Sequence, residues 1–144
     1  MNSLSLKTKY FLQKKKKIYL FDVKNKILGR FSTKICNFII GKNSPNYTPN
    51  YSFINKIIII NAYKIKVNKN KINNKMYYKY SGYMGNKKSI LMIDLFKKNP
   101  CIIIKKSIER MLPKNLLGLK AKKNLIIFKK NHNFKNLKFK KIKL

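Results

Sequence analysis

The chain carries 36 lysine and arginine residues against 3 aspartate and glutamate residues, a formal net charge of +33. A compact body with that charge repels itself strongly. A polyanion would neutralise the charge, so the imbalance favours a nucleic acid or an anionic membrane surface as partner. Any fold of this chain must place the excess basic side chains at its surface or in its tails.

The apolar content is sufficient for a core. Leu, Ile, Val and Phe make up about a third of the 144 residues, above the roughly 20% typical of disordered chains. This length suits one domain. We expect a basic N-terminal extension over residues 1–16, a single α/β domain over residues 17–134, and a basic C-terminal tail over residues 135–144.

The kind of basic residue is also informative. Lysine greatly outnumbers arginine, which stands only at Arg30 and Arg110, and Asn, Ile, Phe and Tyr are abundant. Such usage is typical of an AT-rich genome, as in an organelle or a reduced endosymbiont. Because Asp and Glu codons are also fairly AT-rich, the bias does not explain the scarcity of acids. We therefore interpret the basic surface as selected.

The two cysteines and the apolar runs limit the cellular context. Cys36 and Cys101 have no CxxC spacing, and we expect two reduced, buried thiols rather than a disulfide. Residues 1–13 hold no apolar run before a small-residue cleavage site, so we expect no secretory signal. The densest apolar run, Ile57–Ile60, is far too short to span a bilayer.

A strand, a helix and a second strand are predicted near the start of the domain. Residues 18–21 form a short apolar run, and the four isoleucines within residues 56–61 indicate a strand buried on both faces, as in a parallel sheet. This order is typical of an α/β unit. Residues 28–40 are predicted as the helix, ended by Gly41. Its apolar stripe contains Leu28, Phe31, Ile35, Phe38 and Ile39.

The rest of the chain shows weaker patterns. Residues 64–75 are polar, and Ser89 is predicted to N-cap a short helix that runs to about Lys98. Pro100 suits the first turn of a further helix that ends before Pro113. The predicted stripe of this helix is Cys101, Ile104, Ile108 and Met111. Residues 125–128 are predicted as the last strand.

Catalytic chemistry has few candidate side chains. No pair among the acids, His132 and the cysteines has metal-ligand spacing. The glycine at Leu28-Gly29-Arg30 lacks the G-x-G-x-x-G spacing of a dinucleotide site. We expect a turn or cap role for Asp22, a local ion pair between Asp94 and Lys98, and an exposed contact at His132. Glu109 is expected to balance the neighbouring cations. We predict no enzyme, no cofactor and no metal site.

Residues 75–88 combine lysines with tyrosines. Lysines pair with phosphates, and tyrosines stack on unpaired bases or hydrogen-bond to sugars. The alternative is an ordinary strand with Tyr packed inward and Lys in solvent. Because side chains alternate along a strand, Tyr78 and Tyr80 cannot share every role with Tyr77. The tyrosines and lysines concerned are Lys75, Tyr77, Tyr78, Lys79, Tyr80, Tyr83, Lys87 and Lys88.

Residues 111–123 form a second basic segment. A helix end and Pro113 are followed by what we expect to be a loop, with Lys114, Lys120, Lys122 and Lys123 along it. One interpretation is a connection between a helix and a strand whose lysines are solvated. The other is a loop pressed onto a phosphate backbone.

Several motifs in order resemble one family. They are Asp22 with Leu28-Gly29-Arg30, Gly41-Lys42, Tyr47-Thr48-Pro49, Ile60-Asn61-Ala62, Lys75-Met76-Tyr77-Tyr78, Ser81-Gly82-Tyr83, Gly85, and Met111-Leu112-Pro113-Lys114 with Leu117-Gly118. Together they are similar to ribosomal protein thirteen of the large subunit, bacterial type. The resemblance runs from about residue 18 to residue 134.

The resemblance implies an α/β fold, a three-layer sandwich around a small, mostly parallel sheet with basic loops and tails. It implies a non-enzymatic protein, monomeric within the ribosome, that binds large-subunit rRNA, contacts neighbouring large-subunit proteins and helps early subunit assembly. The implied compartment is the cytoplasm of an AT-rich bacterium or an organelle. With flanking cations added, the candidate RNA-binding residues are Lys42, Tyr47, Lys75, Tyr77, Tyr78, Tyr80, Tyr83, Lys87, Lys88, Arg110, Lys114, Lys120, Lys122 and Lys123.

Two other functions remain open at this point. A nucleic-acid chaperone or nucleoid protein would bind by charge alone, without preference for ribosomal RNA. A membrane-surface protein would need a basic amphipathic helix with a large unpacked apolar face. The ordered motifs disfavour the first, and the expected packing of both long helices against a sheet disfavours the second.

Overall fold

The computed structural model describes residues 17–45, 47–49, 55–132 and 139–142. Two short strands and a helix open the fold as expected: β1 (Ile18–Asp22), α2 (Leu28–Ile40) and β2 (Lys56–Ile60). The later elements are η1 (Ala62–Lys64), α3 (Lys69–Asn74), β3 (Met76–Tyr80), β4 (Lys87–Leu91), α4 (Met92–Lys98), α5 (Pro100–Met111), α6 (Leu116–Lys123), β5 (Leu125–Ile127) and β6 (Lys140–Ile142).

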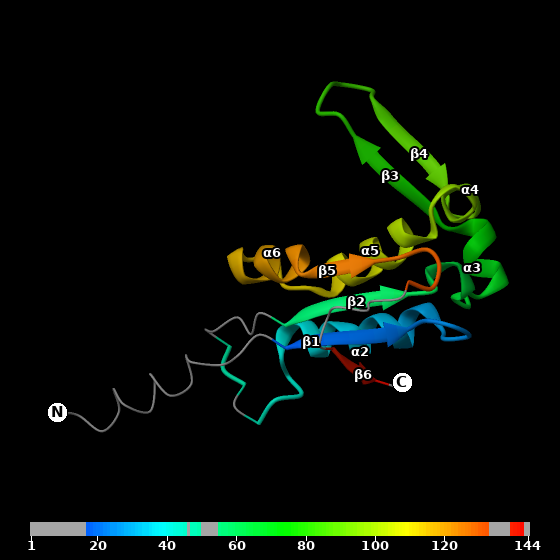
Figure 1. The fold of residues 1–144 in the computed structure, drawn as a ribbon. Coiled ribbons are helices and arrows are strands. Elements are labelled where there is room, and N and C mark those ends of the chain that lie inside the picture. The colour runs from blue at the N-terminus through cyan, green and yellow to red at the C-terminus, as the bar shows by residue number, and fades with distance from the viewer. Residues whose placement is uncertain (1–16, 46, 50–54, 133–138, 143–144) are drawn as a thin grey trace.

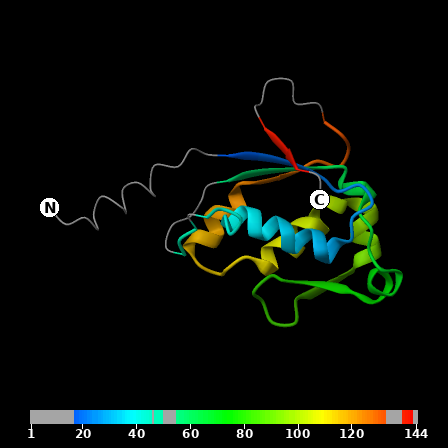
Figure 2. The same ribbon diagram turned by 90° about the horizontal axis from the view of Figure 1, so that it is seen from below.

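A four-stranded parallel sheet is the centre of the fold. Its strand order is β5-β2-β1-β6, and β1 pairs with β2 from Ile18 opposite Lys56 to Asp22 opposite Ile60. The antiparallel pair β3–β4 forms a separate hairpin. Figure 2 shows the layers in the order sheet, long helices, hairpin. The expected α/β class with a small parallel sheet is confirmed.

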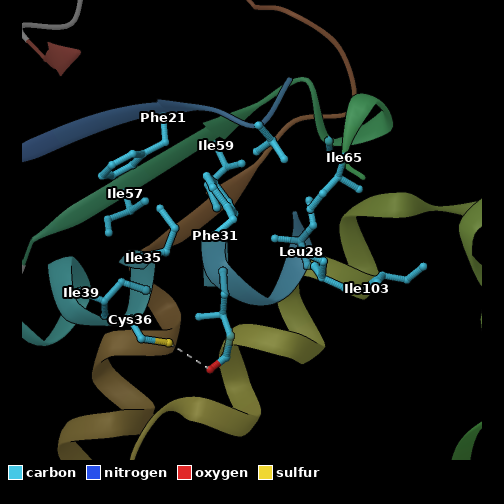
Figure 3. Packing of buried hydrophobic residues seen from close by; sticks show 14 of the residues in the cluster. Phe21, Leu28, Phe31, Ile35, Cys36, Ile39, Ile57, Ile59, Ile65 and Ile103 are labelled. Atoms are coloured by element: carbon cyan, nitrogen blue, oxygen red, sulfur yellow. Dashed lines mark hydrogen bonds between the residues drawn. The ribbon is translucent and has the colours of Figure 1, made fainter. Parts of the chain in front are cut away.

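The main core lies between the sheet and the helices. Phe21, Ile57 and Ile59 point from the sheet toward α2, which contributes Phe31 and Ile35 (Figure 3). Alternate strand residues form a smaller cluster on the opposite sheet face, where Leu20, Ile58 and Ile60 pack with Ile18, Phe128 and Phe139. The prediction that β2 is buried on both faces is therefore confirmed, because successive side chains of a strand point to opposite faces.

Helix α2 follows its predicted bounds. Its stripe is buried, with Phe38 half-buried at the edge, and Gly41 ends it in the left-handed conformation at φ 86°. Helix α5 begins at Pro100 as predicted, with the Asn99 side chain accepting from the Cys101 amide. Its predicted stripe is partly wrong. Ile103, Ile104 and Ile108 are buried, whereas Met111 is exposed.

Two local predictions are corrected. Ser89 does not cap a helix: it lies in β4 opposite Tyr78, and α4 begins only at Met92. The polar segment 64–75, for which no element was predicted, contains the short helix α3. The expected loop after Pro113 is mostly helix α6, whose start is capped by the Asn115 side chain accepting from the Gly118 amide at 2.8 Å.

Strand β6 lies within the segment expected as a basic C-terminal tail. Tyr19, Leu20 and Phe21 of β1 pair with Lys140, Lys141 and Ile142. Ile142 packs at the margin of the main core. A strand of three residues with two lysines carries almost no periodic signal, so its place in the sheet could not be predicted from pattern alone.

Candidate nucleic-acid interface

The aromatic and basic segment forms a hairpin that projects from the body. Strands β3 and β4 pair from Met76 opposite Leu91 to Tyr80 opposite Lys87, and the hairpin rises away from the sheet (Figure 1). The turn uses Gly82 at φ 96° and Gly85 at φ 68°, values that favour glycine over residues with a Cβ. The segment is therefore presented to solvent on a defined frame.

Exposure divides the four tyrosines of this hairpin. The side chains of Tyr78, Tyr80 and Tyr83 are 48%, 68% and 82% exposed, whereas Tyr77 is only 3% exposed. Strand alternation explains the difference, since Tyr78 and Tyr80 occupy the face opposite to Tyr77. Three rings are thus open to stack on unpaired bases.

Tyr77 is a correction to the candidate set. It belongs to the main core, so its ring is not free to stack on a base. Three cations surround that ring: Lys75 Nζ at 5.4 Å from its centroid, Lys106 Nζ at 4.9 Å and Arg110 Cζ at 5.4 Å. Burial raises the pKa of Tyr77, and the Arg110 charge acts in the opposite direction. Tyr77 therefore joins the hairpin base to α5.

The cations around Tyr77 crowd one another. Burial lowers the pKa of Lys75, and the charges of Lys71 and Arg110 lower it further. Lys106 was missed by the sequence analysis. The sequence spacing could have indicated its place beside Arg110, because Lys106 and Arg110 are four residues apart on α5 and so share one helix face.

The outer part of the hairpin carries more unbalanced charge. Lys79 and Lys88 are direct cross-strand partners, and like charges in that position disfavour the pairing. Lys87 Nζ lies 4.3 Å from the centroid of the Tyr78 ring. A bound polyanion would relieve this repulsion. Beside the hairpin base, a depression of about 710 Å³ is lined by Met76, Ser89, Leu91 and residues of α4, Lys97 and Lys98 among them.

The second group of candidates lies on and around α6. Lys114 and Lys120 are exposed, as is Lys123. Lys122 is already engaged, since its Nζ lies 3.1 Å from Glu109 Oε1 of α5. That contact also corrects the expectation for Glu109, which pairs across to α6 and not with its own helical neighbours.

Lys42 and Tyr47 belong to a third position. Lys42 follows the end of α2 and is exposed, and its amide donates to Asn37 at 2.9 Å. Tyr47 is half-buried, with its amide donating to Ser44 at 3.1 Å. Helix α2 packs against α6. The structure thus divides the candidate residues into a hairpin group with Arg110 and a group around α6 and the end of α2.

The remaining polar side chains have structural roles. Asp22 Oδ1 accepts from the Lys24 amide and from Asn61 Nδ2, each at 2.9 Å, which confirms its turn role. The predicted ion pair between Asp94 and Lys98 does not form in the described part of the chain. Cys36 is a buried free thiol as expected, and Cys101 is free and half-buried.

Among the described residues, no three or more of His, Cys, Asp and Glu come together in a group that could hold a metal ion. Within the same ranges, no helix is long and apolar enough to cross a membrane. In the described part of the chain, the hairpin β3–β4 presents exposed tyrosines next to lysines.

Comparison with known proteins gives consistent matches. A family model described as ribosomal protein L13 matches residues 16–133. Proteins named large ribosomal subunit protein uL13 are similar over most of the chain. The one from Wigglesworthia glossinidia brevipalpis is 45% identical over 125 residues, 86% of this chain and 88% of the relative. The one from Buchnera aphidicola of Cinara cedri is 47% identical over 83% of this chain and 84% of the relative. The one from Thermosipho africanus is 42% identical over 79% of this chain and 76% of the relative.

Proposed function

The chain belongs to the ribosomal protein L13 family, and on that premise we propose that it binds large-subunit ribosomal RNA and helps early assembly of the subunit. The family is a structural, non-enzymatic component of the large subunit, and so is this chain. Within the subunit the chain contacts ribosomal RNA first and neighbouring large-subunit proteins second.

One observation carries the proposal. The hairpin β3–β4 holds three exposed tyrosine rings and several lysines outside the packed core. Rings of this kind can stack on splayed bases, and the lysines can replace counterions along the phosphate backbone. A protein that bound RNA by charge alone would not need exposed tyrosine rings on a projecting hairpin.

The lysines around α6 supply a second contact in this proposal. Lys114, Lys120 and Lys123 are exposed, while Lys122 is paired with Glu109 and contributes less free charge. Phosphate contacts fix the position of a protein on RNA. Two separated contact regions would let the chain hold two parts of folded RNA in a fixed relation, which is the mechanical basis for a role in assembly.

The compartment follows from the same premise. The relatives come from bacteria, Buchnera and Wigglesworthia among them. We place the chain on a ribosome in the cytoplasm of an AT-rich bacterium, with an organelle as the alternative. Sedimentation of native lysate through a sucrose gradient tests the ribosomal assignment, with the chain followed by mass spectrometry after a high-salt wash. It should stay with the large subunit, and an even spread across all RNA would contradict the proposal.

A charge series tests the contact regions. Changing Lys87, Lys88, Lys114 and Lys120 to Gln should lower the affinity for large-subunit rRNA. The slope of log affinity against log salt concentration should become less steep by roughly 0.7–0.9 for each phosphate that is no longer neutralised. Circular dichroism should show unchanged folding, because all four side chains are exposed. A matched set at exposed lysines elsewhere, Lys24, Lys56, Lys64 and Lys129, controls for net charge. Equal effects in both sets would mean that the contact regions are wrongly chosen.

A further inference from the structure

Arginine is so rare in this chain that its two positions are informative. Lysine and arginine together number 36, yet arginine stands only at residues 30 and 110. The two side chains carry the same charge but differ in geometry. A guanidinium presents its N–H groups as a planar fork that matches two phosphate oxygens, while an ammonium acts as a point charge. Positions that demand the fork are the ones where lysine cannot substitute.

Arg110 stands in a built cluster of cations. Its Cζ lies 5.4 Å from the centroid of the buried Tyr77 ring, which Lys75 and Lys106 also approach. Glu109, the acid next to Arg110 in sequence, is held by Lys122 at 3.1 Å. The pKa of Lys75 is lowered by burial and by the nearby Lys71 and Arg110 charges, which reflects the same crowding. The cluster is thus electrostatically suited to an anion.

Arg30 stands in a second cluster on the other long helix. It lines a cleft of about 230 Å³ together with Lys26 and Lys34, and the remaining lining residues are Asn25, Ile27 and Phe31. No acid is among them. Arg30 and Lys34 are four residues apart on α2, so their side chains share one face and repel each other. Arg30 thus lies beside two lysines in a cleft whose lining contains no Asp or Glu.

We infer that Arg30 and Arg110 each bind one phosphate of the RNA backbone through the guanidinium fork, with the neighbouring lysines adding charge. The Arg30 cleft is a contact outside both regions described above, and Lys106 becomes part of the Arg110 contact. This inference rests on the proposed function. It adds that the planar geometry of the guanidinium, beyond its charge, determines the affinity for RNA at Arg30 and Arg110.

The test replaces each guanidinium with an ammonium, which keeps the positive charge but removes the planar fork of N–H groups. Arg30→Lys and Arg110→Lys are each compared with the unaltered chain for binding to a bacterial large-subunit rRNA transcript over a range of KCl concentrations. We expect each change to weaken binding about tenfold, equivalent to one charge-assisted hydrogen bond, while the slope of log affinity against log salt stays the same. The charge controls, Lys34→Gln and Lys106→Gln, should flatten that slope.

The matched controls are Lys24→Arg and Lys105→Arg, which add a fork outside the clusters and should leave affinity unchanged. Affinities of both arginine variants within about twofold of the unaltered chain would overturn the inference, since one charge-assisted hydrogen bond is worth more than that. So would an affinity drop at Arg110→Lys matched by an equal drop of stability in urea without RNA, since that result would assign Arg110 to packing on Tyr77. If the unaltered chain shows no preference for rRNA, the proposed function fails first, and the inference fails with it.

Discussion

At the scale of single residues, Gly118 shows how close packing selects an amino acid. It is the third residue of α6, and a Cβ built there would overlap the carbonyl oxygen of Pro113. Its amide also donates to the Asn115 side chain that caps the helix. Glycine is thus required by the approach of the backbone of residue 113, although its own φ is not in the left-handed region.

We expect Gly118→Ala to destabilise the chain by about 1–3 kcal/mol, the range for forcing extra atoms into a packed site. The free energy of unfolding in urea measures it. Gly29→Ala is the control, because a Cβ at Gly29 in α2 meets nothing within 4 Å. That change should be neutral or stabilise by up to about 1 kcal/mol. Equal effects at both sites would show that the Pro113 carbonyl does not approach Gly118 as described.

Cys36 gives a pH prediction. Burial raises the pKa of its thiol to about 11, and the Sγ donates to the Ile108 carbonyl oxygen at 3.7 Å (Figure 3). In the unfolded chain the thiol loses its proton near pH 9. Between those values the unfolded state binds fewer protons than the folded state, so stability falls as pH rises from about 9 to about 11.

The measurement is the difference in urea midpoint between the unaltered chain and Cys36→Ala across that pH range. The variant lacks the thiol, so the unaltered chain should lose stability faster with rising pH than the variant does. Other groups that titrate in this window affect both proteins alike and cancel in the difference. Parallel pH profiles would mean that the Cys36 thiol is not protected by burial.

At the scale of elements, the hairpin has a base that is partly buried in the core and an exposed outer half. The base contributes Tyr77 to the main core, and Met92 of α4, which follows β4, is also buried there. The outer half, from Lys79 to Lys88, is exposed throughout. Stability should therefore depend on the base, and RNA binding on the outer half.

A shortened hairpin tests this division. Replacing residues 79–88 with Asn-Gly joins Tyr78 to Ser89, which are already direct cross-strand partners, by a two-residue turn. The urea midpoint should change little, because no core side chain is removed. Affinity for large-subunit rRNA should fall at least about tenfold, since two exposed rings are removed at about 1–3 kcal/mol each. A chain that unfolded, or that bound rRNA as before, would contradict the division.

At the scale of the whole molecule, the charge acts against the fold. A body with net charge +33 is compact only because its core outweighs the mutual repulsion of its lysines. Added salt screens exposed charges over about 10 Å at 0.1 M and about 3 Å at 1 M. The free chain should therefore gain stability as salt is added, opposite to its affinity for RNA.

A salt titration can check that the stability of the free chain and its affinity for RNA change in opposite directions. The thermal midpoint of the free chain should rise between about 0.05 M and about 0.5 M NaCl, while affinity for rRNA falls over the same range. Substituting Lys79→Gln and Lys88→Gln together should reduce the salt effect on stability, because these side chains oppose each other across the hairpin. A midpoint that falls with salt would mean that attractive ion pairs dominate the surface.

Much of the fold could be predicted from the sequence because local patterns and burial agree there. The stripe of α2 has the helical period, and the four isoleucines of β2 form a short β-branched run of the length of a buried strand. Gly41 and Pro100 mark helix ends through backbone restrictions of their own. The charge imbalance alone pointed to a polyanionic partner, and the ordered motifs pointed to the family.

Tertiary structure alone decided what short or ambiguous segments do. Ser89 pairs in β4 because Tyr78 lies opposite, and Lys140–Ile142 forms a strand because β1 offers an open edge. Tyr77 and Tyr78 are adjacent in sequence, yet packing against α5 buries one ring and leaves the other in solvent. The cation cluster around Tyr77 likewise joins residues from distant segments. Contacts between such segments depend on how the layers pack, and no local period encodes that.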